Sequence, residues 1–227
     1  MSKKATKMLH RTRLKVCGLT RQEDVDAATA CGVDALGFVF YPPSKRCLSP
    51  QQAASLVHNL PAFVSSVALF VEPDVQTVQQ VMAVMRPTLL QFHGAETPDF
   101  CRQFNMPYLK AIRVGAPGLD TSQGLIDYCM QFDDAVGWLF DSYTPAYGGS
   151  GHSFDRQLIV PLSQNVNARP ILISGGMTVD NVTQSIDLLT PWAVDVSSGV
   201  ETMPGVKSLE KIQAFVQAIN KADRRIK

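Results

Sequence analysis

The chain has 227 residues, of which 45% are hydrophobic, so it can bury a large core as two small domains or as one α/β barrel. Its formal net charge is +1, which provides no overall field to attract nucleic acid or an anionic membrane surface. No apolar stretch reaches the roughly 20 residues that a membrane-spanning helix needs. We therefore expect a soluble protein without a nucleic-acid or membrane partner.

The cysteines are odd in number, scattered and without a C-x-x-C pair, which argues against a disulfide framework and against a zinc site. They are Cys17, Cys31, Cys47, Cys101 and Cys129. This usage is typical of a reducing compartment, and we expect a cytoplasmic location. We interpret all except Cys17 as structural or incidental.

Basic residues are frequent in the first dozen positions, but no apolar region of signal-peptide length follows them. We expect residues 1–12 to form a flexible basic tail and residues 13–222 to form a single domain.

Short apolar runs alternate with stretches of helical period from one end of this domain to the other. The runs are nearly continuous in apolar residues, as in parallel strands covered on both faces. They predict eight strands, at residues 13–17, 35–40, 64–70, 89–92, 108–114, 137–141, 171–174 and 193–196.

Helix starts are indicated between the strands. Capping boxes are predicted at Thr20-x-x-Glu23 and at Ser49 to Gln52. A Thr-Pro pair marks another start at Thr97, and Asp74 and Thr178 are further N-cap candidates.

Eight βα units in roughly 210 residues, without linker-like composition, favour a single (β/α)₈ TIM barrel. The structural alternative is a doubly wound sheet, which would need fewer strands in one sheet and a topological switch.

In such a barrel the functional residues lie on the loops that follow the strands. Five chemically capable side chains stand there: Cys17, Arg46, His93, Asp141 and Asp195. Each has an ordinary explanation too, since a free cysteine is usually a small buried hydrophobe and an aspartate can simply bond a neighbouring backbone group.

The last two strands end in glycine-containing loops. Gly175 and Gly176 follow one strand, and Ser198 and Gly199 follow the next. Backbone N–H groups there can approach a ligand closely, and loops seven and eight of such barrels commonly bind phosphate. The alternative is that the glycines are only strand exits.

Residues 141–152 form a long glycine-rich connection, which we interpret as a lid over bound substrate. Its spacing fits neither of the common nucleotide-binding glycine motifs.

Seven motifs in this order resemble the phosphoribosylanthranilate isomerase family, and together they cover about residues 13 to 220. They are Lys15–Thr20, Gly37–Arg46, Gln91–Gly94, Phe140–Ser142, Tyr147–Gly151, Ser174–Met177 and Val194–Glu201. The resemblance implies a (β/α)₈ barrel that converts N-(5-phosphoribosyl)anthranilate to 1-(o-carboxyphenylamino)-1-deoxyribulose 5-phosphate, an Amadori rearrangement in tryptophan biosynthesis. It implies no cofactor and no metal, and a small phosphosugar as the partner.

By this resemblance Asp141 is the general acid and Cys17 the general base. Asp141 must then hold a proton near neutral pH, and Cys17 must be available as thiolate. Lys15 lies two residues before Cys17 and on the same strand face, so we hypothesise that its charge favours the thiolate.

Three residues are candidate substrate ligands. Arg46 suits the anthranilate carboxylate or ring, or pairs with a surface acid. His93 bonds substrate or serves as a structural hydrogen-bonding group. Asp195 orients the phosphate loops or a substrate hydroxyl.

Two rival functions share the phosphate loops. Another phosphosugar enzyme, such as indole-glycerol-phosphate synthase, would have a different acid and base, and a binding protein would need neither. The sequence leaves open whether the chain is a monomer or a homodimer, because periodicity cannot separate an exposed apolar helix face from a core face.

Overall fold

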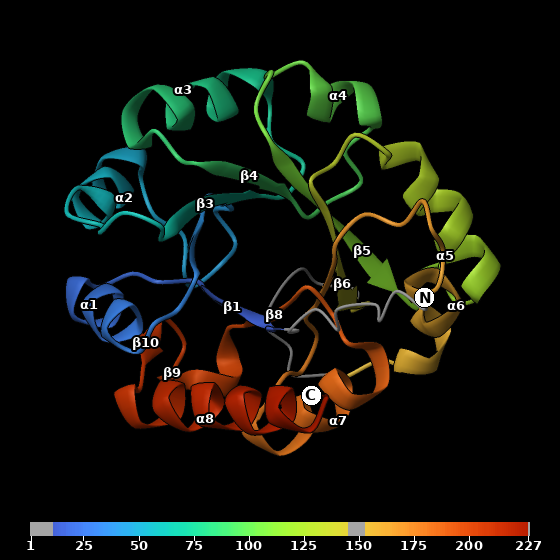
Figure 1. The fold of residues 1–227 in the computed structure, drawn as a ribbon. Helices are drawn as coiled ribbons and strands as arrows, with labels where there is room; N and C mark the ends of the chain where they lie inside the picture. Colours follow the sequence, from blue (N-terminus) through green and yellow to red (C-terminus); the bar gives the residue numbers. More distant parts are fainter. Residues whose placement is uncertain (1–10, 145–152, 227) are drawn as a thin grey trace, which may run out of the picture.

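The structure, a computed structural model, describes residues 11–144 and 153–226. Eight parallel strands close into a barrel in the order in which they occur along the chain (Figure 1). They are β1 Arg13–Cys17, β2 Ala35–Val39, β3 Ser65–Phe70, β4 Leu89–Phe92, β5 Tyr108–Val114, β6 Gly137–Ser142, β7 Ile171–Ile173 and β8 Ala193–Val196. The predicted TIM barrel is confirmed, and every predicted strand agrees with its observed bounds to within one residue.

The helices ring the strands (Figure 1). They are α1 Gln22–Ala30, α2 Pro50–Val57, α3 Val75–Met85, α4 Pro98–Arg102, α5 Ser122–Cys129, α6 Val160–Ser163, α7 Val179–Leu189 and α8 Leu209–Ile226, with short 3₁₀ segments η1 Met130–Phe132, η2 Arg156–Ile159 and η3 Ser198–Val200. After β8, a two-stranded antiparallel sheet follows, with β9 Glu201–Met203 and β10 Val206–Lys207. No helix in the described ranges is long and apolar enough to cross a membrane.

Most of the predicted helix caps are confirmed. The Ser49 hydroxyl accepts from the Gln52 N–H, and the Gln52 side chain accepts in turn from the Ser49 N–H. Asp74, Thr97 and Thr178 are the N-caps of α3, α4 and α7.

The capping box predicted at Thr20 is wrong. Helix α1 begins at Gln22 with Arg21 as its N-cap, and no side chain caps it. The Thr20 hydroxyl instead donates to the Gly205 carbonyl at 2.6 Å, which ties the loop after β1 to the β9–β10 hairpin.

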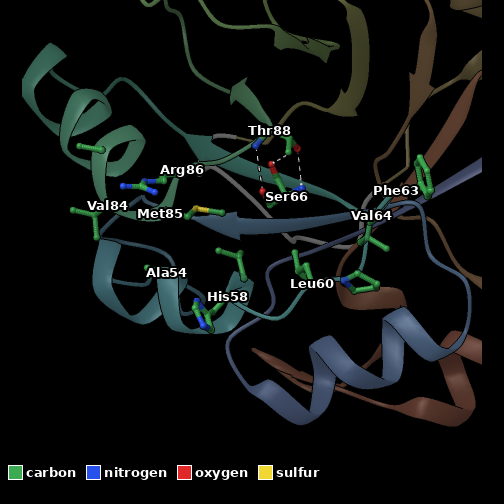
Figure 2. A pocket seen from close by; sticks show the side chains of 14 residues that line it. Ala54, His58, Leu60, Phe63, Val64, Ser66, Val84, Met85, Arg86 and Thr88 are labelled. Carbon is green, nitrogen blue, oxygen red and sulfur yellow. Dashed lines mark hydrogen bonds between the residues drawn. The ribbon is translucent and has the colours of Figure 1, made fainter.

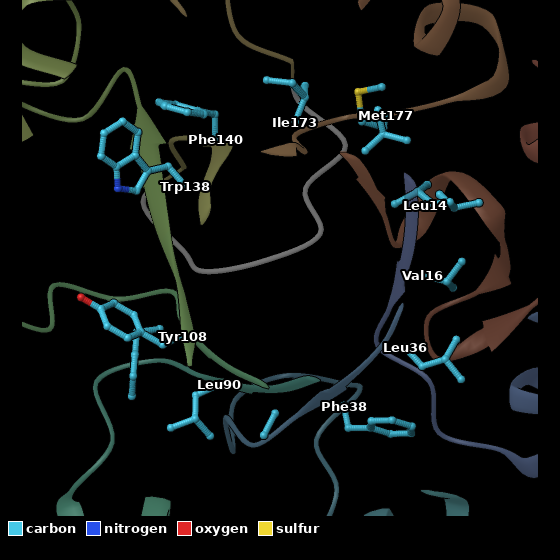
Figure 3. Packing of buried hydrophobic residues seen from close by; sticks show 14 of the residues in the cluster. Leu14, Val16, Leu36, Phe38, Leu90, Tyr108, Trp138, Phe140, Ile173 and Met177 are labelled. Carbon is cyan, nitrogen blue, oxygen red and sulfur yellow. The ribbon is translucent and has the colours of Figure 1, made fainter. Parts of the chain in front are cut away.

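Side chains on the outer face of the strands form the main core (Figure 3). On β4, for example, Leu90 points outward (Figure 3) and is fully buried. Phe92, two residues further along, lies on the same face and packs against Phe100 and Phe104. Because successive strand residues point to opposite faces, Gln91 and His93 point into the barrel.

The interior of the barrel changes in character along its axis. Near the amino ends of the strands it is filled by a small apolar layer of Leu109, Ala111, Leu139, Leu172 and Ala193, with Leu89 packed against them. Toward the carboxyl ends, polar and reactive side chains also point inward, beside an apolar cluster of Cys17, Val39, Leu69 and Val71. This gradient places the chemically capable groups at one end of an otherwise closed core.

The opposite end carries an open pocket of about 580 Å³ between α2, α3 and the segments that lead into β3 and β4. Leu60, Val64, Met85 and Arg86 are among the residues that line it, with the fully exposed ring of Phe63 at its edge (Figure 2). The pocket lies at the amino ends of the strands, away from the residues predicted to do chemistry.

Candidate active site

Cys17 is the last residue of β1, and only 5% of it is exposed. Lys15 shares its inward face and lies in register with Asp195 on the neighbouring β8. The Lys15 Nζ is 2.9 Å from the Asp195 Oδ1 in a buried ion pair. On the other side, a Cβ at Gly37 of β2 would lie 2.8 Å from the Cys17 Sγ and 3.1 Å from the Lys15 Nζ. The space for the thiol and the ammonium therefore depends on a glycine.

The sequence led us to expect that Lys15 lowers the pKa of Cys17, and the structure differs from this expectation. Burial raises the pKa of the thiol, Lys15 opposes that rise, and Asp195 reinforces it, so the pKa of Cys17 lies above its usual value. Burial alone would lower the pKa of Lys15, but Asp195 and Cys17 raise it, so the ammonium keeps its charge. The positive charge that the sequence predicted is present beside the thiol, but the neighbouring carboxylate and the burial outweigh it.

Asp141 lies near the end of β6 and forms a hydrogen-bonded chain with two residues of the β4 segment. Its Oδ2 is 3.0 Å from the His93 Nε2, and the His93 Nδ1 is 3.0 Å from the Gln91 Nε2. The Asp141 Oδ1 also accepts from the Ser142 N–H at 2.8 Å. The structure therefore brings His93 and Asp141 together, whereas sequence reasoning treated them separately.

Arg46 follows β2 and reaches over Gly18, where a Cβ would lie 2.3 Å from the Arg46 Cδ. Its Nε and Nη2 donate to the two carboxylate oxygens of Glu201, at 2.8 and 2.6 Å. Of the two interpretations from sequence, pairing with an acid is seen, but that acid is buried rather than on the surface. The Nη1 group has no hydrogen bond to any described residue, so the guanidinium retains donors for a ligand.

Glu201 and Lys207 are site residues that sequence reasoning missed as participants. The Lys207 Nζ donates to Glu201 at 2.7 Å and to the backbone carbonyl of Cys17 at 2.6 Å. Burial raises the pKa of Glu201, but Arg46 and Lys207 more than offset this, so the pKa of this carboxyl is below its usual value. Glu201 is the last residue of the motif Val194–Glu201, whereas no motif in the sequence includes Lys207.

The two predicted phosphate loops interlock. Gly175 and Gly176 both have positive φ angles, 74° and 61°, which favour glycine. A Cβ at Gly199 would lie only 2.0 Å from the Met177 carbonyl oxygen, so the loop after β8 packs directly on the loop after β7. The N–H groups of Gly175 and Gly176 donate to no acceptor in the part of the chain that the structure describes.

Cys17 and Asp141, the predicted base and acid, therefore lie in two separate clusters at the carboxyl ends of the strands. Cys17, Lys15 and Asp195 form one, with Arg46 beside them, and Gln91, His93 and Asp141 form the other. Gly175 adjoins the second cluster, since a Cβ there would lie 3.1 Å from the Asp141 Oδ1. The lid predicted at residues 141–152 falls largely outside the described residues. Within the described ranges, no three His, Cys, Asp or Glu side chains are grouped as metal ligands.

A closed parallel barrel with a thiol, an acid–histidine pair and two glycine loops at its strand ends defines an enzyme of the (β/α)₈-barrel class. Residues 14–218 match the family model of N-(5'phosphoribosyl)anthranilate (PRA) isomerase. The chain belongs to this family, whose members are isomerases.

Relatives and solved structures agree with this assignment. The chain is 51% identical to the N-(5'-phosphoribosyl)anthranilate isomerase of Bordetella parapertussis over 214 residues, 94% of this chain and 98% of the relative. A phosphoribosyl anthranilate isomerase solved in complex with reduced 1-(o-carboxyphenylamino)-1-deoxyribulose 5-phosphate is 32% identical, with a TM-score of 0.80 over 92% of this chain and 99% of that one. Monomeric forms of the dimeric enzyme from Thermotoga maritima give 32% identity and a TM-score of 0.79, again over 92% of this chain and 99% of that one.

Proposed function

We propose that the chain catalyses the Amadori rearrangement of N-(5-phosphoribosyl)anthranilate in tryptophan biosynthesis, with Asp141 as general acid and Cys17 as general base. The observation that carries the proposal is the placement of a buried thiol and a histidine-bonded carboxyl at strand ends of one barrel mouth, in a chain of this family. The resemblance implies neither a metal nor a cofactor, and the proposal assigns protonation of the ring oxygen to Asp141 and removal of the C2 proton to Cys17.

The first step opens the sugar ring. As the bond between C1 and the ring oxygen breaks, the anthranilate nitrogen shares its electron pair with C1, and an iminium ion forms. The ring oxygen takes a proton and becomes a hydroxyl. Asp141 is the proton donor in this proposal, and the contact with His93 holds its carboxyl at 3.0 Å from an imidazole nitrogen.

The second step removes a proton from C2, which the iminium ion has made acidic. The electron pair of the C2–H bond forms a C1–C2 double bond, and the nitrogen regains its pair, which gives an enolamine. The C2 hydroxyl then loses its proton as the C2 carbonyl forms, the C1–C2 double bond takes up a proton at C1, and the ketose results. Cys17 takes the C2 proton as thiolate, and Lys15 beside it stabilises that charge.

Substrate orientation follows from the surroundings of these two groups. The phosphate would lie against the N–H groups of Gly175 and Gly176, which donate to no described acceptor, with Ser198 and Gly199 on the neighbouring loop. The anthranilate ring would lie on the apolar cluster that Cys17 forms with Val39, Leu69 and Val71. Arg46, which lies over Gly18 next to Cys17, can donate to the ring carboxylate. Asp195 would act through Lys15.

Turnover of Cys17→Ser and Asp141→Asn tests the proposal. Each variant keeps the size of its side chain, so each should fold and bind a phosphosugar, yet lose about 10²- to 10⁴-fold in kcat. Loss of substrate fluorescence measures turnover. Cys101→Ser, which changes a fully buried thiol on α4, is the matched control and should keep its kcat. Rates near those of the native protein in both site variants would refute the assignment, and binding without turnover by the native protein would favour a binding protein.

We also propose that the protein acts in the cytoplasm and is a homodimer, as the Thermotoga maritima relative is. The proposed interface is the surface around Phe63, whose side chain is fully exposed beside an open pocket. This surface is at the opposite end of the barrel from the site, so association would leave the site open. Analytical ultracentrifugation of the native protein and of Phe63→Ser tests this, with a monomeric native protein as the opposing result.

A further inference from the structure

Gln91 is the one inward-facing residue of β4 whose polar side chain lies wholly inside the barrel, with no exposed surface. One end of its amide, Nε2, is 3.0 Å from the His93 Nδ1. The other end, Oε1, has no hydrogen-bond partner among the described residues. The contact with His93 is therefore what fixes the orientation of this amide, since no described donor holds the oxygen.

This orientation matches one proton count of the His93–Asp141 pair. An amide N–H donates to Nδ1, so Nδ1 carries a lone pair and the ring proton is on Nε2. That proton is donated to the Asp141 Oδ2, which is then a carboxylate. The amide orientation in the structure is thus the one that fits the pair when Asp141 lacks the proton.

The form with one more proton requires the opposite amide. If Asp141 carries the proton, it donates to Nε2, and the ring proton must be on Nδ1. If the ring carries both protons, Nδ1 is again a donor. In either case an N–H on Nδ1 would face the NH₂ of Gln91. Gln91 and His93 then form a hydrogen bond only if the amide turns by half a rotation and presents Oε1.

We propose that Gln91 is a positioning residue whose amide rotates with each proton that the His93–Asp141 pair gains or loses. The amide donates when the pair has lost the proton and accepts when the pair holds it. This inference rests on the proposed acid role of Asp141. In this role Gln91 provides a buried hydrogen-bond partner for both protonation states of the pair, from a position that does not touch the substrate.

The catalytic cycle needs both forms. Asp141 must hold a proton before the ring opens and lacks it immediately afterwards. A fixed donor below His93 would favour the second form, and a fixed acceptor would favour the first. An amide provides either partner, whereas neither a carboxylate nor an apolar side chain can.

Other charged groups surround the pair, and they are the same in every Gln91 variant. They are Arg113 on β5, in register with Asp141, Glu72 and Glu96 beside Gly94, Lys110 paired with Glu96, and the Lys15–Asp195 pair from β1 and β8. Gln91→Met adds no charge, so its effect reports on the loss of the amide. Gln91→Glu adds a charge that itself favours the protonated pair, so its pH profile is read together with the His93 tautomer in the same variant.

The direct test is the tautomer of His93, read by long-range ¹H–¹⁵N correlations within the imidazole ring of the full-length, ligand-free protein. The chain has only four histidines, and His93→Gln assigns the signal. We expect the ring proton on Nε2 at alkaline pH, and a proton on Nδ1 once the pair has taken up its proton. A ring that keeps Nδ1 protonated at alkaline pH, or never protonates it, would overturn the proposal.

Two variants test the coupling to the reaction. Gln91→Glu offers only an acceptor, so Nδ1 should stay protonated and the pair should hold its proton to higher pH, which moves the alkaline limb of the kcat profile upward. Gln91→Met offers neither partner, so kcat should fall by about 10-fold or more at every pH, with KM nearly unchanged and the limb unmoved. The same profile in both variants would mean a merely structural role and would overturn the proposal.

If a variant fails to fold, the His93 tautomer measurement on the native protein still decides the test. Failure of the acid role itself is distinguishable, because it appears as turnover by Asp141→Asn and leaves the tautomer measurement unaffected. A tautomer that changes as expected, with kcat of Gln91→Glu equal to that of the native protein at every pH, would also refute the proposed link to catalysis.

Discussion

Lys15 and Asp195 form a buried ion pair below Cys17, on the neighbouring strands β1 and β8, with 2.9 Å between Nζ and Oδ1. The two charges act on the thiol in opposite directions. Lys15 lowers the pKa of Cys17, and Asp195 together with burial raises it. The barrel thus keeps the base protonated at rest while a full positive charge stays within reach of the thiolate.

This arrangement predicts opposite effects of neutralising the two partners. Asp195→Asn should lower the pKa of Cys17, so kcat/KM should rise toward its plateau at lower pH. Lys15→Met should raise the pKa of Cys17 further and lower kcat/KM at neutral pH. Ultraviolet absorbance of the thiolate, with Cys17→Ser as the blank, measures the first quantity, and the pH profile of turnover measures the second.

Removal of one partner from a buried pair leaves an unpaired charge and costs about 3–5 kcal/mol of stability. The double variant Lys15→Met with Asp195→Leu is therefore the control for folding, because it leaves neither charge. Identical pH profiles in the two single variants would contradict the interpretation that this pair adjusts the thiol.

Gly37 offers a second prediction, because its missing side chain makes room for the thiol. In Gly37→Ala the new methyl group would lie 2.8 Å from the Cys17 Sγ and 3.1 Å from its Cα, so the thiol must move. A displacement of a catalytic group on this scale lowers kcat by about 10²-fold. Steady-state kinetics and thermal unfolding together measure the effect.

The control for Gly37→Ala is Gly32→Ala. Gly32 has open space around its Cβ position but a φ of 76°, so alanine there costs about 1–2 kcal/mol of stability with no contact near the site. We expect this control to unfold more easily and to keep its kcat. Equal losses of kcat in the two variants would mean that Gly37 acts only through stability.

The strands were predictable to within one residue because each is a nearly continuous apolar run between polar loops. This pattern depends only on residues that are neighbours in the sequence. The Ser49 cap was predictable for the same reason, since its partner Gln52 is three residues away. Such features depend on residues that are close together in the sequence, so the sequence alone predicts them.

Features that depend on distant partners were not predictable. Thr20 has the sequence of a capping residue, but Gly205, 185 positions away, takes its hydroxyl. Lys207 bonds the Cys17 carbonyl across 190 positions. The pKa of Cys17 depends on burial and on the balance between Lys15 and Asp195, and periodicity gives neither quantity.

Arg46 supplies a third prediction. Arg46→Lys loses the two-point contact with Glu201 and the planar fork that suits a carboxylate, so KM should rise by about tenfold or more, with a smaller change in kcat. Arg21→Lys is the matched control, because Arg21 forms the same two-point contact with Asp24 at 3.0 and 2.6 Å, at the start of α1. Steady-state kinetics should show an unchanged KM there. An unchanged KM in Arg46→Lys would assign Arg46 to structure alone.

Cys101 on α4 leads to a prediction about alkaline stability. Its thiol has no exposed surface, and burial raises the pKa of Cys101 from the ordinary 9.0 to about 12. Between these two values the native protein keeps the proton and the unfolded chain has lost it. Unfolding then releases a proton, so this residue's contribution to stability is complete below pH 9 and is lost as the pH rises toward 12.

Cys101→Ala should therefore have a shallower decline of unfolding free energy between pH 9 and 12 than the native protein, by up to ~1.4 kcal/mol per pH unit. The alanine also leaves a small cavity, but that cost is the same at every pH and does not alter the slope. Urea unfolding at a series of pH values measures both quantities. Cys31→Ala is the control, since Cys31 is only partly buried at the end of α1 and should change the slope less. Parallel curves for the native protein and Cys101→Ala would show that this thiol loses its proton as readily in the folded protein as in the unfolded chain.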